Sequence, residues 1–424
     1  EKRDYLTATS AQRCIRAGGK HNDLENVGYT LRHHTFFEML GNFSFGDYFK
    51  KEAIKYAWEL LTEVYKISPE KLWITVHIND QESEKIWLNE IGIQPDRISK
   101  LDDDNFWSMG DTGPCGPCSE IFYDHGEAFS GESPAEGVDT GDRFVEIYNL
   151  VFMQFNRSPD GELSSLPKPS VDTGMGLERI TAVLQGINDN YETDLFKDLI
   201  KKIASSLGTQ NLENPSLRVI ADHLRSSSYL IADGLSISNE GRGYVLRRII
   251  RRALRHAYKL NPDYEKPLSG FVKELVSQMG TEHPYLSKNK KTIEKTIKKE
   301  EQQFSLTLRN GMRIFEEETP KDVNEVSGEL AFKLYDTFGF PLDMTIDLAR
   351  EKNIAVNIKE YEKLMKQQRD LAKASSNFDS LMPSSISLDK PTNFIGYNKS
   401  KCKSKVLKVF VNQKEQEALE SDID

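Results

Sequence analysis

The first part of the chain alternates short apolar runs with polar turns. Residues 72–78 (LWITVHI) and 144–155 (FVEIYNLVFMQF) are rich in β-branched and aromatic side chains, which is typical of strands. Residues 52–66 instead repeat apolar positions at helical spacing. One face of this segment carries Ile54, Trp58, Leu61 and Tyr65. Lone helices among several strands predict an α+β domain over residues 1–194, built on an antiparallel sheet with flanking helices.

From about residue 195 the helical period takes over. Four segments have the apolar spacing of amphipathic helices, namely 195–207, 216–234, 242–258 and 289–318. They predict a helical domain over residues 195–375. The Ser- and Pro-bearing segment 374–391 is typical of a linker. Strand-like residues resume after it, so residues 376–424 are expected to hold a linker and the start of a β domain.

Composition narrows the range of functions. The 424 residues carry 56 Lys and Arg against 66 Asp and Glu, and the net charge of -10 argues against a protein that coats nucleic acid through its overall field. No apolar run reaches the roughly 18 residues of a membrane helix. Four cysteines in a chain this long favour a reducing cytoplasm over a disulfide framework. Because the chain starts at Glu1 without a signal peptide or initiator Met, a cytoplasmic fragment is expected.

A cationic hairpin is predicted near the amino terminus. Residues 13–49 contain two strand-like runs joined by a long Gly-rich polar loop. Such a hairpin can bring together four cationic or potentially cationic side chains, those of Arg16, Lys20, Arg32 and His33. Arginine suits phosphate oxygens because its fork is planar and always charged, so one anionic ligand is expected here. The alternative is a surface hairpin with scattered charges.

A second segment, residues 167–180 (PKPSVDTGMGLERI), predicts a short strand that leads into a helix. Gly174 and Gly176 allow either a tight turn or a close approach to a ligand, and Glu178 and Arg179 follow on the helix. The sequence has neither the three-glycine fingerprint of a dinucleotide fold at this point nor a GxxxxGK[ST] loop. A Rossmann site and the usual phosphate-binding loop are therefore excluded.

These two segments resemble motifs of the class II aminoacyl-tRNA synthetases. Arg16, the loop, and His33 followed four residues later by Phe37 match the second motif of the class. The run Gly174-Met-Gly-Leu-Glu-Arg179 matches the third motif. Within the class, residues 13–49, DNFWSMGDTGPCGPCSE and PSVDTGMGLERI are similar to the alanine-specific family, and the resemblance runs from residue 3 to 424. It implies a class II antiparallel sheet, then a tRNA-recognition domain, then the first strands of an editing barrel.

The resemblance implies an ATP site. Arg16 would hold the α-phosphate, where charge shifts during attack by the amino-acid carboxylate, so Arg16 and Arg179 are the implied catalytic residues. Phe37 and Arg179 would stack on the two faces of the adenine, and Lys20 would face the phosphates or the tRNA 3′ end. The implied ATP ligands are Arg16, Arg32, His33, Phe37 and Arg179. With Mg²⁺ shielding the triphosphate, orientation and charge stabilisation suffice for catalysis.

The resemblance also implies an alanine pocket. Asp172 would pair with the substrate ammonium, and Gly174 would leave room beside it. Trp107 and Val151 would wall a space that fits a methyl group and little more. L-alanine and the acceptor stem of its tRNA are thus the implied partners, and no membrane is implied.

The chain departs from the class pattern in two places. The first motif of the class, a long helix and strand, precedes the second, which here begins within about a dozen residues of Glu1. We therefore expect an incomplete core edge and little activity, and ATP–pyrophosphate exchange at a rate normal for such enzymes would contradict this. In addition, Ala17 and Gly18 follow Arg16, where many members carry Glu two residues on.

Residues 238–259 predict a helix with a cationic face. Arginines recur every four residues at Arg247, Arg251 and Arg255. No acidic residue lies between Glu240 and Asp263, so the local charge suits an RNA phosphate backbone. The alternative is a helix that acidic neighbours neutralise in the fold. By the resemblance, Asn239 and Asp336 would read the G·U pair of the acceptor stem in the shallow minor groove.

Metal ligands are scarce in the sequence. Cys115 and Cys118 have the Cys-x-x-Cys spacing of zinc sites, but Cys14 and Cys402 have no companions at ligand spacing. A tight Gly-Pro turn near the active site is therefore favoured, and no protein-bound metal site is predicted. His223 is interpreted as a packed or surface histidine, and residues 32–34 (RHH) as cations that face a ligand.

The sequence thus predicts an ATP-dependent ligase that joins alanine to AMP and transfers it to the 3′ end of its tRNA. Two alternatives stay open, a module that binds the acceptor stem without activating an amino acid and a paralogue that adenylates a carboxylate for another acceptor. Because residues 1–424 end before any histidine and cysteine cluster of the editing type, no hydrolysis of mischarged tRNA is expected.

Overall fold

The computed structural model describes most of the chain, namely residues 4–18, 22–135, 137–138, 140–264, 267–320, 323–375, 399, 401–406, 409–411 and 414–416. The chain divides into two compact units, Glu1–Leu306 and Thr307–Asp424. The boundary predicted at residues 194–195 lies inside the first unit, because helices beyond it hydrogen-bond to the strand after the cationic loop. Within these ranges no helix has both the length and the apolarity to span a lipid bilayer.

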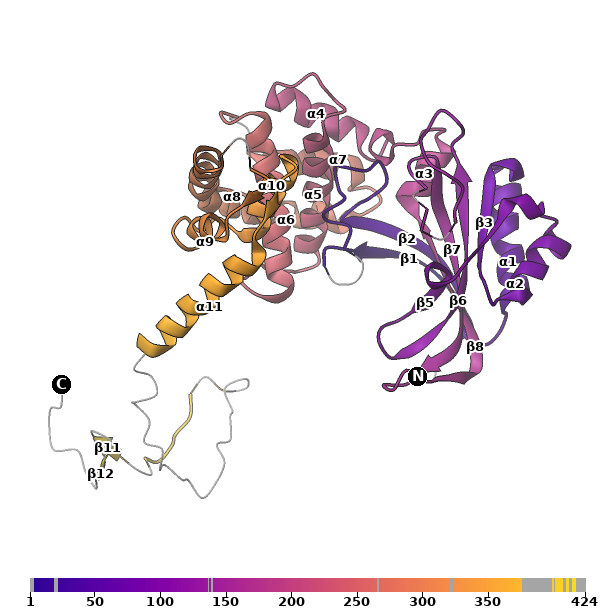
Figure 1. Cartoon of the computed structure of the whole chain (residues 1–424), viewed down its shortest axis with the longest axis horizontal. Coiled ribbons are helices and arrows are strands. Elements are labelled where there is room, and N and C mark those ends of the chain that lie inside the picture. The colour runs from indigo at the N-terminus through magenta and orange to yellow at the C-terminus, as the bar shows by residue number, and fades with distance from the viewer. Residues whose placement is uncertain are drawn as a thin grey trace. The chain divides into compact units, whose positions relative to one another are not determined.

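An eight-stranded sheet forms the centre of the first unit (Figure 1). Its strands follow in the order β1 (Thr7–Ile15), β2 (Phe36–Ser44), β8 (Leu163–Gly176), β7 (Phe144–Arg157), β6 (Gly113–Asp124), β3 (Leu72–His77) and β4 (Ile98–Leu101), and β5 (Phe106–Ser108) pairs with β6 off this path. Every pairing is antiparallel except that of β3 with β4. The predicted α+β fold on an antiparallel sheet is therefore confirmed, with one parallel pair at an edge.

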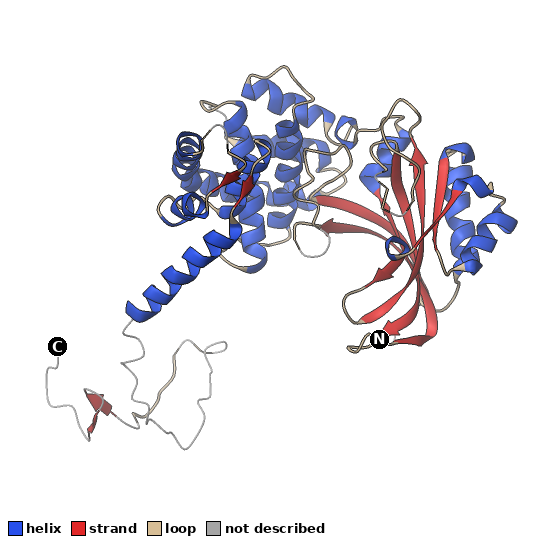
Figure 2. Cartoon of the chain, in the orientation of Figure 1, coloured by secondary structure: helices blue, strands red, loops and turns tan. Residues whose placement is uncertain are grey.

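Two helical segments pack on this sheet (Figure 2). Helix α1 (Lys50–Glu59) continues into the π-helical turn η1 (Leu60–Val64), and α2 (Gln81–Lys85) continues into η3 (Ile86–Ile91). Short 3-10 helices precede three of the strands: η2 (Pro69–Lys71), η4 (Pro95–Arg97) and η5 (Asp103–Asn105). The fully buried side chains of Ile54, Leu61 and Trp87 share a core with strand residues such as Ile74. Burial of one such side chain stabilises the fold by about 1.5–3 kcal/mol. The apolar stripe that predicted a helix at residues 52–66 is thus the face that packs on the sheet.

Strand β8 runs further than the sequence indicates. The short strand predicted to end near Asp172 continues to Gly176, where helix α3 (Leu177–Leu184) begins. Gly174 lies opposite Asn149 of β7, and neither Gly174 nor Gly176 has a positive φ. A Cβ atom at Gly174 would lie 2.8 Å from Sδ of Met39. The backbone at these glycines is therefore extended rather than tightly turned, Gly174 packs closely on Met39, and the predicted close approach to a ligand stays a prediction.

Helices make up the rest of the first unit. In chain order they are η6 (Asn190–Glu192), α4 (Lys197–Leu207), α5 (Pro215–Ala232), α6 (Gly241–Leu260), η7 (Leu268–Phe271), α7 (Val272–Met279) and α8 (Pro284–Glu318), the last of which crosses the unit boundary. Helix α5 begins where the side chain of Asn214 accepts a hydrogen bond from the backbone N–H of Ser216, with Pro215 at the first helical position. Nearly every residue of α5 is buried, so this helix is the centre of the helical layer.

The second unit adds shorter elements. They are β9 (Glu325–Val326), α9 (Gly328–Asp336), α10 (Leu342–Glu351), β10 (Ala355–Val356), α11 (Ile358–Ser375), β11 (Val409–Val411) and β12 (Lys414–Gln416). Strands β9 and β10 pair in parallel, whereas β11 and β12 pair antiparallel. The predicted linker at 374–391 falls outside the described residues beyond Ser375. Most of the β domain predicted after it also falls outside them.

Candidate active site

A cleft in the first unit brings the two motif-bearing segments together. It has a volume of about 530 Å³. Its lining includes Arg16 and Phe37 from the hairpin and Gly174, Gly176 and Arg179 from the end of β8 and the start of α3. The residues that the sequence predicted to surround one nucleotide therefore lie around one cleft.

Strand register explains how residues so distant in the chain meet. In the β1–β2 hairpin, Cys14 lies opposite Phe37, which places Arg16 just beyond the end of β1. In the β2–β8 pair, Met39 lies opposite Gly176. Because α3 begins directly after Gly176, its first turn carries Arg179 to the same end of the sheet as Phe37.

Two of the arginines that line the cleft, Arg16 and Arg179, are held by acidic neighbours. The Arg16 guanidinium lies over the Phe37 ring, 5.0 Å from its centroid, and 3.8 Å from a carboxylate oxygen of Asp23. Arg179 Nη1 donates to the carbonyl oxygen of Glu146 at 2.7 Å and lies 3.1 Å from its carboxylate. These contacts orient both planar cations toward the cleft, an arrangement that suits phosphate oxygens and an aromatic base.

His33 lines the cleft, but its predicted charge is wrong. Burial and the charges of the neighbouring Arg179 and Arg32 together lower the pKa of His33 to about 3, so the imidazole is neutral at physiological pH. Its Nδ1 lies 2.7 Å from the Thr30 hydroxyl. Arg32 also lines the cleft and donates to the carbonyl oxygen of Gly141 at 2.6 Å. Lys20, predicted to face the phosphates, lies outside the described residues.

A larger groove adjoins the cleft. It has a volume of about 1960 Å³, and it is lined by all four residues predicted to bind alanine: Trp107, Val151, Asp172 and Gly174. The cleft and the groove share Arg16, Phe37, Met39, Glu146 and Gly174. A nucleotide and a small second substrate could therefore meet beside Arg16.

Asp172 has the surroundings of a partner for a buried cation. It lies opposite Val151 in the β7–β8 pair, so the two side chains share one face of the sheet. Burial raises the pKa of Asp172, since water no longer fully solvates the carboxylate. A bound ammonium would compensate for this lost solvation. Val151 is buried beside it.

The sequence interpretation missed two carboxylates in the groove. Glu120 of β6 and Glu146 of β7 both line it. Burial raises the pKa of Glu120 well above its usual range, and the charges of Glu146 and Asp104 raise it further. The amide of Asn149 donates to Glu120 at 2.9 Å. The sequence did hold a sign of Glu146, because Glu146 and Asn149 are the polar residues in the otherwise apolar run 144–153.

The predicted cysteine turn is instead part of strand β6. The pairing of β6 with β7 shifts register between Cys115 and Cys118, which forms an irregularity in the strand rather than a Gly-Pro turn. Both thiols are buried, and burial raises the pKa of Cys118, which lines the groove. Among the described residues no group of three or more His, Cys, Asp or Glu side chains could hold a metal ion.

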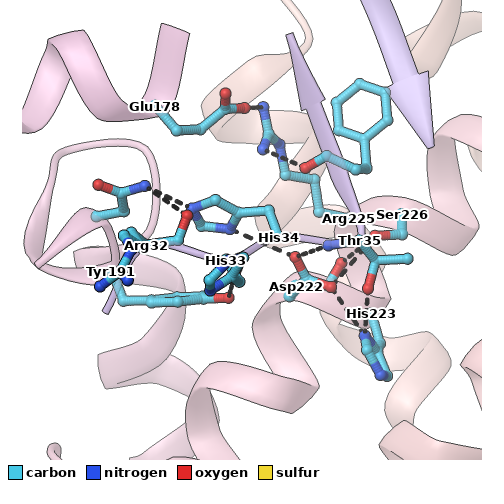
Figure 3. Close-up of polar contacts among 12 residues, drawn as sticks. Arg32, His33, His34, Thr35, Glu178, Tyr191, Asp222, His223, Arg225 and Ser226 are labelled. Atoms are coloured by element: carbon cyan, nitrogen blue, oxygen red, sulfur yellow. Dashed lines mark hydrogen bonds and ion pairs between the residues drawn. The ribbon is translucent and has the colours of Figure 1, made fainter. Parts of the chain in front are cut away.

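His223 is a packed histidine within a buried polar network (Figure 3). Its Nδ1 lies 2.8 Å from Asp222, and Asp222 also accepts a hydrogen bond from the backbone N–H of Thr35 at 3.0 Å. His34 lies 3.4 Å from the same carboxylate. Although burial alone would raise the pKa of Asp222, its hydrogen bonds with His223 and His34 lower it. This network ties helix α5 to the residues just before β2.

Helix α6 does not present its arginines as one free cationic face. The Arg255 side chain is fully buried, and its Nη2 lies 2.8 Å from Nε2 of His256. This burial corrects the prediction that Arg255 faces tRNA, because four-residue spacing places a side chain on a stripe without telling which neighbours cover that stripe. Arg242, in the first turn of α6, is exposed.

Arg247 and Arg251 are partly exposed and are paired with one acidic residue. Arg251 Nε donates to Glu300 of α8 at 2.7 Å, and Arg247 Nε lies 3.5 Å from the same oxygen. The predicted alternative, neutralisation by acidic neighbours, therefore holds for this part of the helix. Arg247 also donates a hydrogen bond to the exposed side chain of Asn239.

The two side chains predicted to read the G·U pair lie in different units. Asn239 precedes α6 in the first unit, and Asp336 ends α9 in the second. Both are exposed, and Gln368 of α11 donates a hydrogen bond to Asp336. Each is thus oriented by a neighbour within its own unit.

Comparisons with known proteins agree with this geometry. A family model described as tRNA synthetases class II (A) matches residues 1–423. Curated proteins named Alanine--tRNA ligase are similar over nearly the whole chain: 56% identity over 414 residues in Hydrogenovibrio crunogenus, 55% over 416 in Nitrosococcus oceani and 54% over 423 in Idiomarina loihiensis. These matches cover 97%, 97% and 99% of this chain but 48%, 47% and 49% of the relatives, so the chain spans about half their length.

Proposed function

Because the chain belongs to the family tRNA synthetases class II (A), we propose that it activates L-alanine with ATP and transfers it to the 3′ end of tRNA(Ala). The single observation that carries this proposal is the meeting of Arg16, Phe37 and Arg179 around one cleft that opens into a groove lined by Asp172. The names of the relatives support alanine as the amino acid.

ATP binds in the cleft. The adenine stacks between Phe37 and Arg179, and Arg16 contacts the α-phosphate, where negative charge shifts as the carboxylate of alanine attacks. Arg32 and neutral His33 complete the wall on the phosphate side. The reaction needs no covalent bond to the protein, since alignment of the two substrates and charge stabilisation lower the barrier.

Mg²⁺ fits the acidic part of the groove. Glu120 and Glu146 offer carboxylate oxygens, which are the ligands that this hard cation prefers. Burial raises the pKa of Glu120, and the charges of Glu146 and Asp104 raise it further, so a cation bound beside these carboxylates would offset both effects. These two residues would hold the ion, which would shield the charge of the triphosphate.

Alanine binds beside Asp172, which pairs with its ammonium group. Trp107 and Val151 restrict the pocket to a side chain of about one methyl group, and the close packing of Gly174 on Met39 keeps that wall in place. Recognition of tRNA uses Asn239 and Asp336 on the G·U pair of the acceptor stem, as short polar side chains suit the edges of bases in the RNA minor groove.

The decisive experiment is ATP–pyrophosphate exchange across the twenty amino acids. We expect exchange that depends on alanine in the parent chain and its loss in Arg16→Ala and Asp172→Ala. Alanylation of a tRNA minihelix with and without its G·U pair then tests the transfer step. A chain that binds the minihelix but shows no exchange with any amino acid is a binding module only. Exchange with alanine but no transfer to RNA would point to another acceptor.

A further inference from the structure

A buried arginine of helix α5 lies beside the strand that carries Phe37. The Arg225 side chain is 1% exposed, and its Nη2 lies 2.6 Å from Oε1 of Glu178, which is equally buried (Figure 3). Arg225 Nη1 donates to the carbonyl oxygen of Phe36 at 3.3 Å. One guanidinium from the helical layer therefore contacts both β2 and the first turn of α3.

Glu178 extends this contact to the other side of Phe37. Its carboxylate accepts the backbone N–H of Glu38, with distances of 3.3 Å and 3.2 Å to the two oxygens. The carbonyl before Phe37 and the amide after it are thus bound to one ion pair. Glu178 also directly precedes Arg179 in α3. The ion pair consequently fixes the strand of Phe37 against the helix turn of Arg179.

Aromatic rings leave the Arg225 guanidinium little freedom. It lies over the Phe36 ring at 4.7 Å and over the Phe196 ring at 5.2 Å. Phe36 stacks in turn on Tyr229 of the same helix, with ring centroids 4.1 Å apart. A planar guanidinium can bond two acceptors while it stacks on these rings, whereas a lysine ammonium can supply the charge but not the fork.

We propose that Arg225 is a positioning residue for the nucleotide, because it sets the spacing between the two groups that stack on the adenine. The proposal rests on the proposed function, which assigns Phe37 and Arg179 to the adenine. Arg225 itself does not line the cleft. Its effect on ATP passes through Glu178 and the backbone around Phe37.

The first test separates the two substrates kinetically. In Arg225→Lys, the KM for ATP in ATP–pyrophosphate exchange is expected to rise by about tenfold or more, since small displacements of binding groups have effects of this order or larger. The KM for alanine should stay within about twofold of the parent value, because Asp172 and Val151 are on strands that Arg225 does not contact. A loss of overall stability would lower the active fraction without this split.

Arg218→Lys is the matched control. Arg218 lies on the same helix and forms a similar ion pair, with Nη2 2.8 Å from Asp189, but neither residue lines the cleft. The control should keep the parent KM for ATP. A rise in the KM for ATP that is equal in Arg218→Lys and Arg225→Lys would overturn the proposal, as would an unchanged KM in Arg225→Lys.

A second test measures ATP binding directly in Glu178→Gln, so that its result does not depend on the exchange reaction. The glutamine keeps the shape and one acceptor oxygen but loses the charge that holds Arg225, so it should raise the dissociation constant for ATP, measured by calorimetry, as Arg225→Lys does. Parent chain that binds ATP but shows no exchange would contradict the proposed function and leave this comparison valid. If the variants then bind ATP like the parent, the positioning role is wrong, and if the parent does not bind ATP, both proposals fail.

Discussion

At the scale of the residue, burial shifts the pKa of groups that line the cleft and the groove. His33 is neutral because burial and the adjacent arginines lower its pKa to about 3, so it can accept or donate a hydrogen bond but adds no charge. Asp172 is affected in the opposite sense, since burial raises its pKa. For both residues, burial thus shifts the pKa in the direction that disfavours the charged form.

The raised pKa of Asp172 predicts the pH dependence of alanine activation. Asp172 must be ionised to pair with an ammonium. An exposed aspartate has a pKa of about 3.9. Because the pKa of Asp172 is raised, its protonation begins at a higher pH than that of an exposed aspartate. On acidification, kcat/KM for alanine is expected to fall before kcat/KM for ATP does. Exchange rates measured against each substrate over a pH series check this, and parallel losses for both substrates would contradict it.

Asp172→Asn supplies the control for that assignment. A carboxyl whose pKa is higher in the folded than in the unfolded chain destabilises the fold above the folded pKa, and this cost disappears below the unfolded pKa. Removing the charge should therefore keep or raise Tm at neutral pH while alanine activation is lost. A lower Tm would show that the carboxylate stabilises the fold instead.

At the scale of the element, helix α6 places its arginines in three different surroundings. Its buried arginine Arg255 packs inside the first unit, Arg247 and Arg251 share Glu300, and Arg242 is exposed in the first turn. Under the proposed function, we therefore expect RNA to contact the amino-terminal end of the helix rather than its whole length. Asn239, held by Arg247, lies just before that end.

Replacement of arginine by glutamine should have different effects at two positions of α6, on stability at Arg255 and on RNA binding at Arg242. Arg255→Gln is expected to lower the free energy of unfolding by about 1–3 kcal/mol, because it leaves buried partners unpaired, with little change in the KM for a minihelix once folded. Arg242→Gln should leave Tm unchanged and reduce the slope of log affinity against log salt by about one, as expected for one lost phosphate contact. Thermal melts and minihelix titrations at several salt concentrations measure both effects. Equal salt slopes for Arg242→Gln and the parent would exclude that contact.

At the scale of the whole molecule, the proposed function predicts that activation and RNA reading can be separated by mutation. The cleft and groove lie entirely within the first unit, whereas the two predicted readers of the G·U pair are divided between the units. Neighbours orient each reader separately, Arg247 for Asn239 and Gln368 for Asp336. Under the proposed function, activation of alanine therefore depends on residues of the first unit alone.

Asp336→Ala tests this separation. Alanine-dependent exchange should be unchanged, whereas kcat/KM for the G·U minihelix should fall by the equivalent of about 1–3 kcal/mol, toward that of a G·C minihelix. If both side chains contact the same base pair, Asn239→Ala should lower kcat/KM for the minihelix less in the Asp336→Ala background than in the parent. The reason is that the free-energy effects of contacts with a shared partner are not additive. Fully additive losses, or a drop in exchange, would argue against joint reading by the two units.

The local pattern of residues determined a good part of this protein. Apolar spacing predicted the helix that became α1 and the long helices after residue 195, and the α+β class followed from the strand-rich first part. The cationic residues of the predicted hairpin also selected Arg16, and the resemblance to class II motifs selected Phe37 and Arg179. These properties are local, since helical or extended periodicity and the chemistry of a guanidinium do not depend on distant neighbours.

Only the tertiary structure decided which neighbours cover each side chain. The spacing of the α6 arginines could not reveal that Arg255 is buried, and nothing in the segment 32–34 shows that His33 loses its charge. The contact between Arg225 and Glu178 joins residues 47 positions apart, with Phe37 held between them. Burial and pairing depend on segments brought together from across the chain, and these are the quantities that set pKa values and the orientation of side chains.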